Sequence, residues 1–225
     1  MQALVIGSSG GVGAALTRQL RADPRYSMVA SLSRSEDGLD ITDETSISDA
    51  AQRLLDMHGH FSLIINATGA LVIHGHAPEK SIKAISPAAM AQQFLVNAVG
   101  PALLLKHFHA LLPRQGQGVF ASLSARVGSI GDNRLGGWIS YRAAKAAQNQ
   151  IVKTASLEIA RTHPDAVVVA LHPGTVETRL SQSFTKGHHT MTPDEAARKL
   201  LAVIEKLRPA QTGGFFSYDG QPIEW

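Results

Sequence analysis

The chain contains 225 residues, of which 44% are hydrophobic, and its formal net charge is +3 at neutral pH. This length can enclose a substantial core, and no uninterrupted apolar run is long enough to cross a bilayer. Cysteine is absent, which excludes disulfides and thiolate metal sites and is compatible with a cytoplasmic protein. Lys and Arg are scattered, so the small basic excess does not indicate nucleic-acid binding and equally suits a site for a phosphorylated cofactor.

The first predicted element is a strand at 3–6, into which the N-terminus runs directly, so no signal peptide is expected. A glycine-rich turn from Gly7 to Gly13 follows, and apolar residues then recur at helical spacing up to Leu20. Gly7, Gly11 and Gly13 would let the backbone approach a pyrophosphate, which the helix start would bind through its N–H groups and positive dipole end. The spacing differs from the general dinucleotide fingerprint, so a plain strand-to-helix turn is the alternative.

Further strands and helices alternate along the chain. Apolar, β-branched runs occur at 28–32, 63–65, 119–123, 167–171 and 215–218, and helical patterns lie near 47–57, 88–112, 143–161 and 193–207. This alternation predicts an α/β fold: a Rossmann-type, doubly wound parallel sheet of about seven strands with helices on both faces, in a single domain over residues 1–225. Segment 177–192, rich in Ser, Thr, Gly and His, is expected to form a substrate lid, with a plain surface loop as the alternative.

Tyr141 and Lys145 are four residues apart at the start of a predicted helix and therefore share one helix face. An unperturbed phenol titrates near about 10, and an adjacent ammonium would lower that pKa. Such a pair can act as an acid or a base toward a hydroxyl or carbonyl group. The same spacing is common in solvated helices, and the dinucleotide turn upstream is what favours the chemical interpretation.

The end of the second predicted strand carries Ser33 and Arg34, with no acidic residue before Glu36. An acid there commonly binds the ribose hydroxyls of NAD, and it would repel a 2′-phosphate. Arg34 can bind that phosphate through charge-assisted hydrogen bonds, with Ser8, Ser9 and Ser33 as further donors. We therefore expect NADP(H) as the preferred cofactor and NAD(H) as the second choice, an exposed loop arginine being the alternative interpretation.

Taken together, these motifs resemble the short-chain dehydrogenase/reductase family over essentially the whole chain. The glycine turn, the Asn-Ala-Thr-Gly segment at 66–69, the pair Tyr141 and Lys145 and the Pro-Gly pair at 173–174 carry the resemblance. The stretch 128–138 resembles the subgroup around C-factor and the sniffer-type carbonyl reductases. The resemblance implies NADP(H)-dependent reduction of an aldehyde or ketone with Tyr141 as general acid. The alternative is a nucleotide-binding sensor or signalling protein of the same fold with little turnover.

The resemblance also implies roles for individual residues. Asp40 would receive the adenine amino group, Lys145 would hold the ribose, and Asn97 would anchor a water of the proton relay. The implied cofactor-binding residues are Gly7, Ser8, Ser9, Gly11, Val12, Gly13, Ser33, Arg34, Asp40, Ile41, Asn66, Ala67, Thr68, Gly69, Tyr141, Lys145, Pro173, Gly174, Val176 and Thr178.

The chain departs from the family pattern at the serine that orients the substrate. Aligning Gly128 with the family's glycine puts Ala125 at the usual serine position, and Ser124 is the nearest hydroxyl. Adjacent strand residues point to opposite faces, so only a bulge or a strand end would turn Ser124 inward. We assign the role to Ser124, while Ala125 leaves open a site with weak catalysis. The expected catalytic residues are therefore Tyr141, Lys145, Ser124 and Asn97.

The remaining expectations concern the substrate and partners. The residues expected to line a mostly apolar substrate pocket, each of which would also suit core packing, are Trp138, Leu135, Val176, Leu180 and Phe184. The His-x-His pairs have no further ligand at zinc spacing, so no metal is expected. The Ala-rich helix at 143–155 implies, by the resemblance, pairing of subunits in a homodimer or homotetramer, with packing on the sheet as the alternative. We expect a small carbonyl or alcohol substrate and neither nucleic acid nor a membrane as partner.

Overall fold

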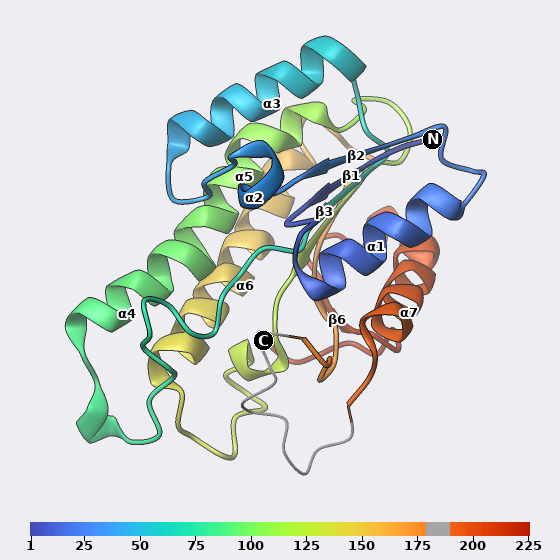
Figure 1. Ribbon diagram of the computed structural model, residues 1–225. Coiled ribbons are helices and arrows are strands. Elements are labelled where there is room, and N and C mark those ends of the chain that lie inside the picture. The colour runs from blue at the N-terminus through green and yellow to red at the C-terminus, as the bar shows by residue number, and fades with distance from the viewer. Residues whose placement is uncertain (179–189) are drawn as a thin grey trace.

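The computed structural model describes residues 1–178 and 190–225 and shows one sheet with helices on both sides (Figure 1). All neighbouring strands are parallel, in the order β2-β1-β3-β4-β5-β6. The strands are β1 (Gln2–Ile6), β2 (Met28–Leu32), β3 (Leu63–Asn66), β4 (Val119–Leu123), β5 (Val167–His172) and β6 (Phe215–Ser217). The α-helices are α1 (Gly11–Ala22), α2 (Arg34–Asp37), α3 (Glu44–His58), α4 (Pro87–Phe94), α5 (Gly100–Phe108), α6 (Ile139–Ile159) and α7 (Pro193–Lys206). The shorter turns are the π-helical η2 (Leu95–Val99) and the 3₁₀ turns η1 (Ile82–Ala84), η3 (His109–Leu111), η4 (Arg126–Gly128) and η5 (Pro209–Gln211).

Alternate residues of each strand enter two separate cores, one on each face of the sheet. Leu4 and Ile6 of β1 belong to the core with α3, α5 and α6, whereas Ala3 and Val5 belong to the core with α1 and α7. The strands β3 and β4 are buried at every position because both faces are covered. Figure 1 shows these two groups of helices on opposite sides of the sheet. The predicted Rossmann-type doubly wound sheet is therefore confirmed.

The sheet has six strands, whereas the sequence predicted about seven. In the described structure, the chain between β2 and β3 contains only the helices α2 and α3. Segment 33–43 is polar and turn-forming: Ser33 caps the start of α2, and Gly38 ends it with a left-handed φ of 71°. Without a longer β-branched run in this segment no further strand forms, and β2 remains an edge strand whose first four residues are only half-buried.

Local signals explain where several helices begin. Asp43 accepts a hydrogen bond from the Thr45 N–H at the start of α3, and Thr192 accepts one from the Glu195 N–H at the start of α7. Helix α1 differs, because its N-cap Gly10 makes no side-chain hydrogen bond to the first turn. The first N–H groups of α1 are therefore left for a ligand.

The strand order reverses between β1 and β3, and this is the point at which doubly wound sheets bind ligands, beyond the carboxyl ends of the strands. Gly7 follows β1 and donates its N–H to the carbonyl of Leu32 at 2.7 Å. Ala67 follows β3 and donates its N–H to the carbonyl of Ile6 at 2.8 Å. The glycine turn and the 66–69 segment thus leave the sheet side by side at this point.

One helical stretch of the described chain, Pro87–Leu111, is long and apolar enough to span a membrane by length and composition, with a mean hydropathy of 1.4. The sequence analysis did not expect such a stretch, which includes α4, η2 and α5. Leu104, Leu105 and Phe108 within it belong to the core between the sheet and α3. Core helices of globular proteins can have this same composition, and here 39% of the most apolar window is buried within the chain.

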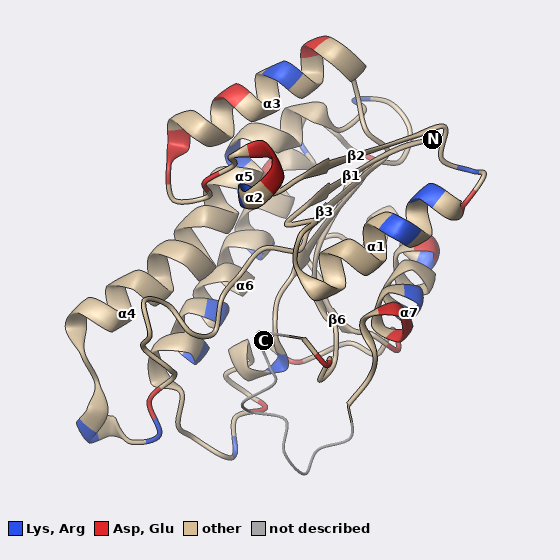
Figure 2. Cartoon of the chain, viewed as in Figure 1, with Lys and Arg blue, Asp and Glu red and all other residues tan. Residues whose placement is uncertain are grey.

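Acidic and basic side chains alternate on the outer surface. Figure 2 shows both signs side by side along α3 and along α7. Arg18 of α1 pairs with Asp194 of α7 at 2.7 Å, and Lys106 of α5 pairs with Glu44 of α3. Exposed pairs of this kind contribute little stability and indicate solvated surfaces on these helices.

Candidate active site

The glycine-rich turn after β1 provides a cradle of backbone. Gly7 has a left-handed φ of 90°, which favours glycine. A Cβ atom on Gly13 would overlap the carbonyl oxygen of Gly7, so only glycine lets α1 start this close to β1. The hydroxyl of Ser8 is buried and has no hydrogen-bond partner among the described residues. An unpaired buried donor beside the uncapped start of α1 fits the pyrophosphate of a dinucleotide.

Gly11 of this turn faces the segment after β5. Ser9 and Gly11 are exposed and Val12 is half-buried. A Cβ atom on Gly11 would lie 2.6 Å from Cγ2 of Thr178. The structure therefore brings the first and the last of the predicted cofactor segments into contact.

The 66–69 segment meets the predicted catalytic residues at Gly69. A Cβ atom on Gly69 would lie 3.0 Å from Oδ1 of Asn97 and 3.4 Å from Nζ of Lys145. Asn97 is fully buried, accepts the N–H of Ala70 at 3.0 Å and donates to the carbonyl of Ala70 at 2.8 Å. It stands in the π-helical turn η2, a local widening that often marks functional positions.

Within this segment, Asn66 holds the turn in shape. Its Oδ1 accepts the N–H of Thr68 at 3.0 Å and the hydroxyl of Thr68 at 2.6 Å, and its Nδ2 donates to Oγ of Ser122 at 3.0 Å. The side chain thus connects the end of β3 to the neighbouring strand β4 and fixes the turn at 66–69.

Tyr141 and Lys145 lie in the first two turns of α6, as predicted. Nζ of Lys145 lies 5.9 Å from the centroid of the Tyr141 ring. It donates to Oε1 of Gln148 at 2.8 Å and to the carbonyl of Leu123 at 3.4 Å. A Cβ atom on Gly128 would lie 2.8 Å from the backbone of Lys145, so η4 packs directly against Lys145.

Burial shifts the pKa values of both residues of this pair. It raises the pKa of Tyr141 well above its usual range and lowers the pKa of Lys145 to about 7. The sequence analysis predicted that the lysine lowers the pKa of the phenol, and the structure does not bear this out. The reason is that Nζ lies over the ring, and that desolvation disfavours both the phenolate and the ammonium.

The hydroxyl of Ser124, to which we assigned the orientation of the substrate, has a partner inside the protein. This hydroxyl is buried and donates to Oδ1 of Asn149 at 2.6 Å. Asn149 lies on α6 one turn beyond Lys145, on the buried side of the helix. Ala125 is half-buried and precedes η4, which packs against Lys145. The hydroxyl of Ser124 is therefore committed to the interior.

The sequence predicted that no acidic side chain lies at the end of β2, and the structure differs from this prediction. Ser33 is buried, and its N–H donates to Oδ2 of Asp37 at 2.8 Å. The short helix α2 folds Asp37 back to the strand end, although it lies four residues further along the chain. Arg34 is exposed at the first position of α2. A cation and a carboxylate therefore both stand near the predicted 2′-phosphate position.

The turn that carries Asp40 and Ile41 lies against α5. Oδ1 of Asp40 accepts the hydroxyl of Thr42 at 2.7 Å and its N–H at 2.8 Å, and these bonds lower the pKa of Asp40. A Cβ atom on Gly100 would lie 3.0 Å from the carbonyl of Ile41, so a glycine at the start of α5 permits this approach.

The segment after β5 is held at both of its described ends. Gly174 has a left-handed φ of 82° after Pro173. The Glu177 N–H donates to the carbonyl of Met191 at 2.9 Å, next to a bridge between Val176 and Met191. Residues 179–189 of the predicted lid, including Leu180 and Phe184 of the predicted pocket, lie outside the described residues.

Two further residues of the predicted pocket lie in the β4–α6 connection. Trp138 is half-buried, and its ring contacts the ring of Tyr141 edge to face at 6.2 Å. Leu135 is 92% exposed, so it does not form a wall in this structure. Core packing is therefore excluded for Leu135.

Several buried polar residues beside Tyr141 and Lys145 were not among the predicted site residues. Gln148 binds Lys145, Gln93 accepts from Nδ2 of Asn97 at 2.7 Å, and Glu79 accepts the Ser140 N–H at the start of α6. Gln148 follows Lys145 by three residues and Tyr141 by seven, which is the spacing of one helix face. The helical spacing of Gln148 from Tyr141 and Lys145 is the feature of the sequence that could have identified it as a neighbour of this pair.

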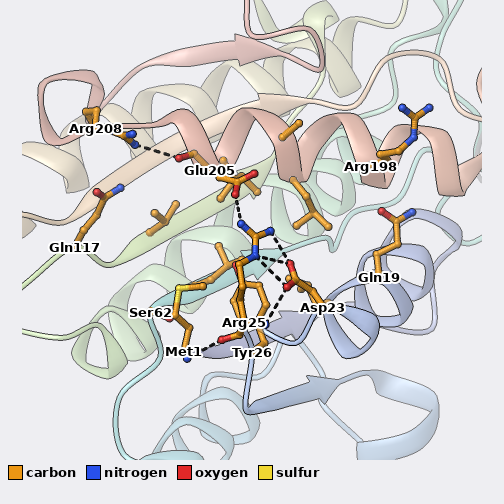
Figure 3. A pocket seen from close by; sticks show the side chains of 16 residues that line it. Met1, Gln19, Asp23, Arg25, Tyr26, Ser62, Gln117, Arg198, Glu205 and Arg208 are labelled. Atoms are coloured by element: carbon orange, nitrogen blue, oxygen red, sulfur yellow. Dashed lines mark hydrogen bonds and ion pairs between the residues drawn. The ribbon is translucent and has the colours of Figure 1, made fainter.

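A separate cleft of about 520 Å³ lies at the opposite, amino-terminal edge of the sheet (Figure 3). Met1 and Ser62, which precede β1 and β3, line it together with residues of α1 and α7. In Figure 3 the guanidinium of Arg25 lies between the carboxylates of Asp23 and Glu205, so its charge is already balanced. Ligands of doubly wound sheets bind at the other edge.

Over residues 1–178 and 190–225, no group of three His, Asp or Glu side chains could hold a metal.

Comparisons with known proteins agree with this geometry. The profile of the family described as short chain dehydrogenase matches residues 1–189. The 1-hydroxy-2-glutathionyl-2-methyl-3-butene dehydrogenase of Rhodococcus sp. (strain AD45) is 29% identical over 234 residues, covering 99% of this chain and 98% of the relative. The C-signal protein of Myxococcus xanthus is 36% identical over 142 residues, covering 61% of this chain and 80% of the relative.

Solved structures share the fold. The carbonyl reductase Sniffer of D. melanogaster has a TM-score of 0.84 at 21% identity, covering 100% of this chain and 99% of that chain. The NADPH-bound carbonyl reductase from chicken fatty liver has a TM-score of 0.84 at 23% identity, covering 100% and 94%. A short-chain dehydrogenase/reductase from Burkholderia multivorans with bound NADP has a TM-score of 0.83 at 24% identity, covering 100% and 99%. With the family profile spanning most of its length, the chain belongs to the short chain dehydrogenase family of oxidoreductases.

Proposed function

We propose that this protein reduces an aldehyde or ketone to an alcohol with NADPH, and that residues 1–225 act as one cofactor-binding domain. The observation that carries the proposal is the convergence at Gly69, where Asn97 and Lys145 reach the segment after β3. In a doubly wound sheet this segment borders the dinucleotide site. This supports Lys145 as the residue that contacts the cofactor, with its Nζ 5.9 Å from the centroid of the Tyr141 ring.

NADP(H) is the cofactor that we favour. Arg34 is exposed at the start of α2 and can bind a 2′-phosphate, while Ser8 and Ser33 lie at the neighbouring strand ends. The carboxylate of Asp37 would repel a 2′-phosphate, although it already accepts the Ser33 N–H. The chicken and Burkholderia multivorans structures, solved with NADPH and NADP, share the fold and support this choice.

When bound, the reduced nicotinamide supplies the hydride that adds to the carbonyl carbon. Tyr141 gives its hydroxyl proton to the carbonyl oxygen as that oxygen gains negative charge. The phenol carries a proton at neutral pH, while burial raises its pKa and so makes that proton harder to give up. Lys145 holds the ribose, and Asn97 holds a water that returns a proton to Tyr141. Trp138, against the Tyr141 ring, shapes one side of the substrate pocket.

A second candidate function is a nucleotide-binding sensor or signalling protein with little turnover. The observation that favours it is the position of the Ser124 hydroxyl, which is committed to Asn149 while Ala125 stands at the family's serine position. The similarity to the C-signal protein of Myxococcus xanthus is compatible with such a role.

An activity panel distinguishes the two functions. Aldehydes, ketones and quinones are offered with NADPH, and the loss of reduced-cofactor absorbance is followed. A glutathione-conjugated alcohol with NADP⁺ is added because of the name of the Rhodococcus relative. Turnover of a carbonyl substrate supports the reductase. Tight NADPH binding without turnover in the whole panel supports the sensor, and a failure to bind NADPH contradicts both.

We further propose that the chain forms a cytoplasmic homodimer or homotetramer through the outer faces of α5 and α6. Only 39% of the most apolar window of Pro87–Leu111 is buried within the chain. Val99, beside α5, and Leu157, on α6, are exposed apolar residues. Covering them with a second subunit would bury apolar area. Light scattering after size exclusion tests this, and a monomer at micromolar concentration contradicts it.

A further inference from the structure

Gln148 is a fully buried amide in α6, one turn beyond Lys145. Its Oε1 accepts from Nζ of Lys145 at 2.8 Å. Its Nε2 donates to Oγ of Ser122 at 2.9 Å and to the carbonyl of Leu123 at 3.1 Å. Both ends of this amide are therefore occupied, which is what a buried amide requires.

The orientation of the Gln148 amide is determined by its neighbours. A carbonyl oxygen such as that of Leu123 can only accept, and an ammonium such as that of Lys145 can only donate. Turning the amide over would point Nε2 at the ammonium and Oε1 at the carbonyl. The side chain must therefore present its acceptor to Lys145.

The same network continues to the cofactor segment. Oγ of Ser122 also accepts from Nδ2 of Asn66 at 3.0 Å, and Oδ1 of Asn66 binds the N–H and hydroxyl of Thr68. A continuous series of buried side chains thus runs from Lys145 through Gln148, Ser122 and Asn66 to the turn after β3. The lysine and the turn that it approaches at Gly69 are held by one network.

We propose that Gln148 is a positioning residue that holds the ammonium of Lys145 at the height of the cofactor turn. This inference rests on the proposed function, because it concerns the site that we assign to NADPH. An apolar residue at this position would leave Lys145 with the longer contact to Leu123 at 3.4 Å. A carboxylate would bind the ammonium in an ion pair and compete with the cofactor for it. A neutral amide holds the lysine in place and leaves it available to the ribose.

Within the part of the chain that the structure describes, the other groups around Lys145 are uncharged. They are the Tyr141 ring at 5.9 Å, the carbonyl of Leu123 and the 69–70 backbone near Asn97. Burial is the cause of the lowered pKa of Lys145. The acceptor of Gln148 therefore opposes this effect, since a hydrogen bond to a charged form favours that form.

The experiment compares Gln148→Met, which keeps the length of the side chain without its polar atoms, with Gln148→Glu, which keeps an acceptor. Gln150→Met is the matched control, because Gln150 is an exposed glutamine of the same helix whose side chain donates a hydrogen bond to Thr154. The chain has eight lysines, so selective ¹³C,¹⁵N-lysine labelling resolves Lys145, and the signal lost in Lys145→Arg assigns it. Titration of its Cε shift is followed without cofactor. NADPH binding, kcat and KM are measured separately, and thermal unfolding shows that each variant is folded.

We expect Gln148→Met to lower the pKa of Lys145 and to weaken NADPH binding about tenfold, while Gln148→Glu raises that pKa. Gln150→Met should change neither quantity. If Gln148→Met lowers the melting temperature but leaves the Lys145 titration and NADPH affinity unchanged, Gln148 is only a packing residue and the proposal is wrong. The titration and binding readouts need no turnover. A protein without reductase activity that still shows both changes refutes the proposed reaction and supports the positioning role.

Discussion

Oγ of Ser124 lies 2.6 Å from Oδ1 of Asn149, and Asn149 stands about 12 Å along α6 from Tyr141. The only hydroxyl adjacent to the expected serine position is thereby bound to the far part of the helix. In the alignment on Gly128, Ala125 takes the position at which the family keeps a donor for the substrate oxygen. The two positions can therefore be tested separately by substitution.

Restoring that donor is the first prediction. Ala125→Ser should raise kcat on a carbonyl substrate, by as much as roughly 10²–10³, because one donor to a developing oxyanion has that effect. Steady-state kinetics with NADPH measure it. Ser124→Ala is the matched variant and should leave kcat unchanged while lowering stability by about 1–3 kcal/mol, since Asn149 loses its donor. The opposite pattern, with activity lost in Ser124→Ala and unchanged in Ala125→Ser, would show that Ser124 orients the substrate.

Tyr141→Phe should lower kcat by about 10²–10⁴, because it removes the proton donor and keeps the ring. NADPH affinity, measured by fluorescence titration, should remain within about twofold, since the hydroxyl is not needed to bind the nucleotide. Tyr26→Phe, in the cleft at the other edge of the sheet, is the control and should retain full activity. Substantial turnover by Tyr141→Phe on a good substrate would refute Tyr141 as the acid.

Cofactor choice depends on the two charges at the end of β2. Arg34→Glu should weaken NADPH binding about tenfold or more and spare NADH, because it removes a charge-assisted contact and adds repulsion. Asp37→Asn should act in the opposite direction and raise the ratio of NADPH to NADH affinity, since it removes a carboxylate near the 2′-phosphate. Calorimetric titration of both cofactors measures these ratios. Equal affinities in the unmodified protein would contradict the preference for NADP(H).

The burial of Lys145 predicts a pH-dependent cost in stability. Its pKa is about 7 in the folded protein, and it is near about 10.4 in the unfolded chain. Between these values the unfolded state binds a proton that the folded state does not, so stability rises with pH over this window. Lys145→Met should therefore be more stable than the unmodified protein, most of all below about pH 7, with the difference narrowing toward about pH 10. Urea unfolding at several pH values measures it, with Lys153→Met on the same helix as control. If the stability difference between Lys145→Met and the unmodified protein does not change with pH, the lowered pKa of Lys145 is not its cause.

The glycine turn offers a matched pair of substitutions. Gly13→Ala should abolish NADPH binding and destabilise the protein, because its Cβ would overlap the carbonyl oxygen of Gly7. Gly10→Ala should be tolerated, since its φ of −74° suits alanine and its Cβ would lie 3.4 Å from that oxygen. Equal effects of the two substitutions on NADPH affinity would show that close packing of α1 on β1 is not what shapes the turn.

The sequence by itself determined those features that depend on neighbours within a few residues. Apolar, β-branched runs predicted the strands, and apolar residues at helical spacing predicted the helices between them. Each of these elements is determined by the periodicity of its own residues. The pair Tyr141 and Lys145 was found because four residues make one helical turn. The glycine turn was found because its backbone must leave a strand and start a helix within a few residues.

Only the tertiary structure decided which side chains of different elements meet. The commitment of Ser124 to Asn149 joins β4 to α6, and the return of Asp37 to Ser33 depends on the short helix α2. The raised pKa of Tyr141 also follows from packing, because burial is a property of the whole fold. A buried polar atom takes whichever partner the packed elements bring within hydrogen-bond distance, and no local pattern in the chain specifies that partner.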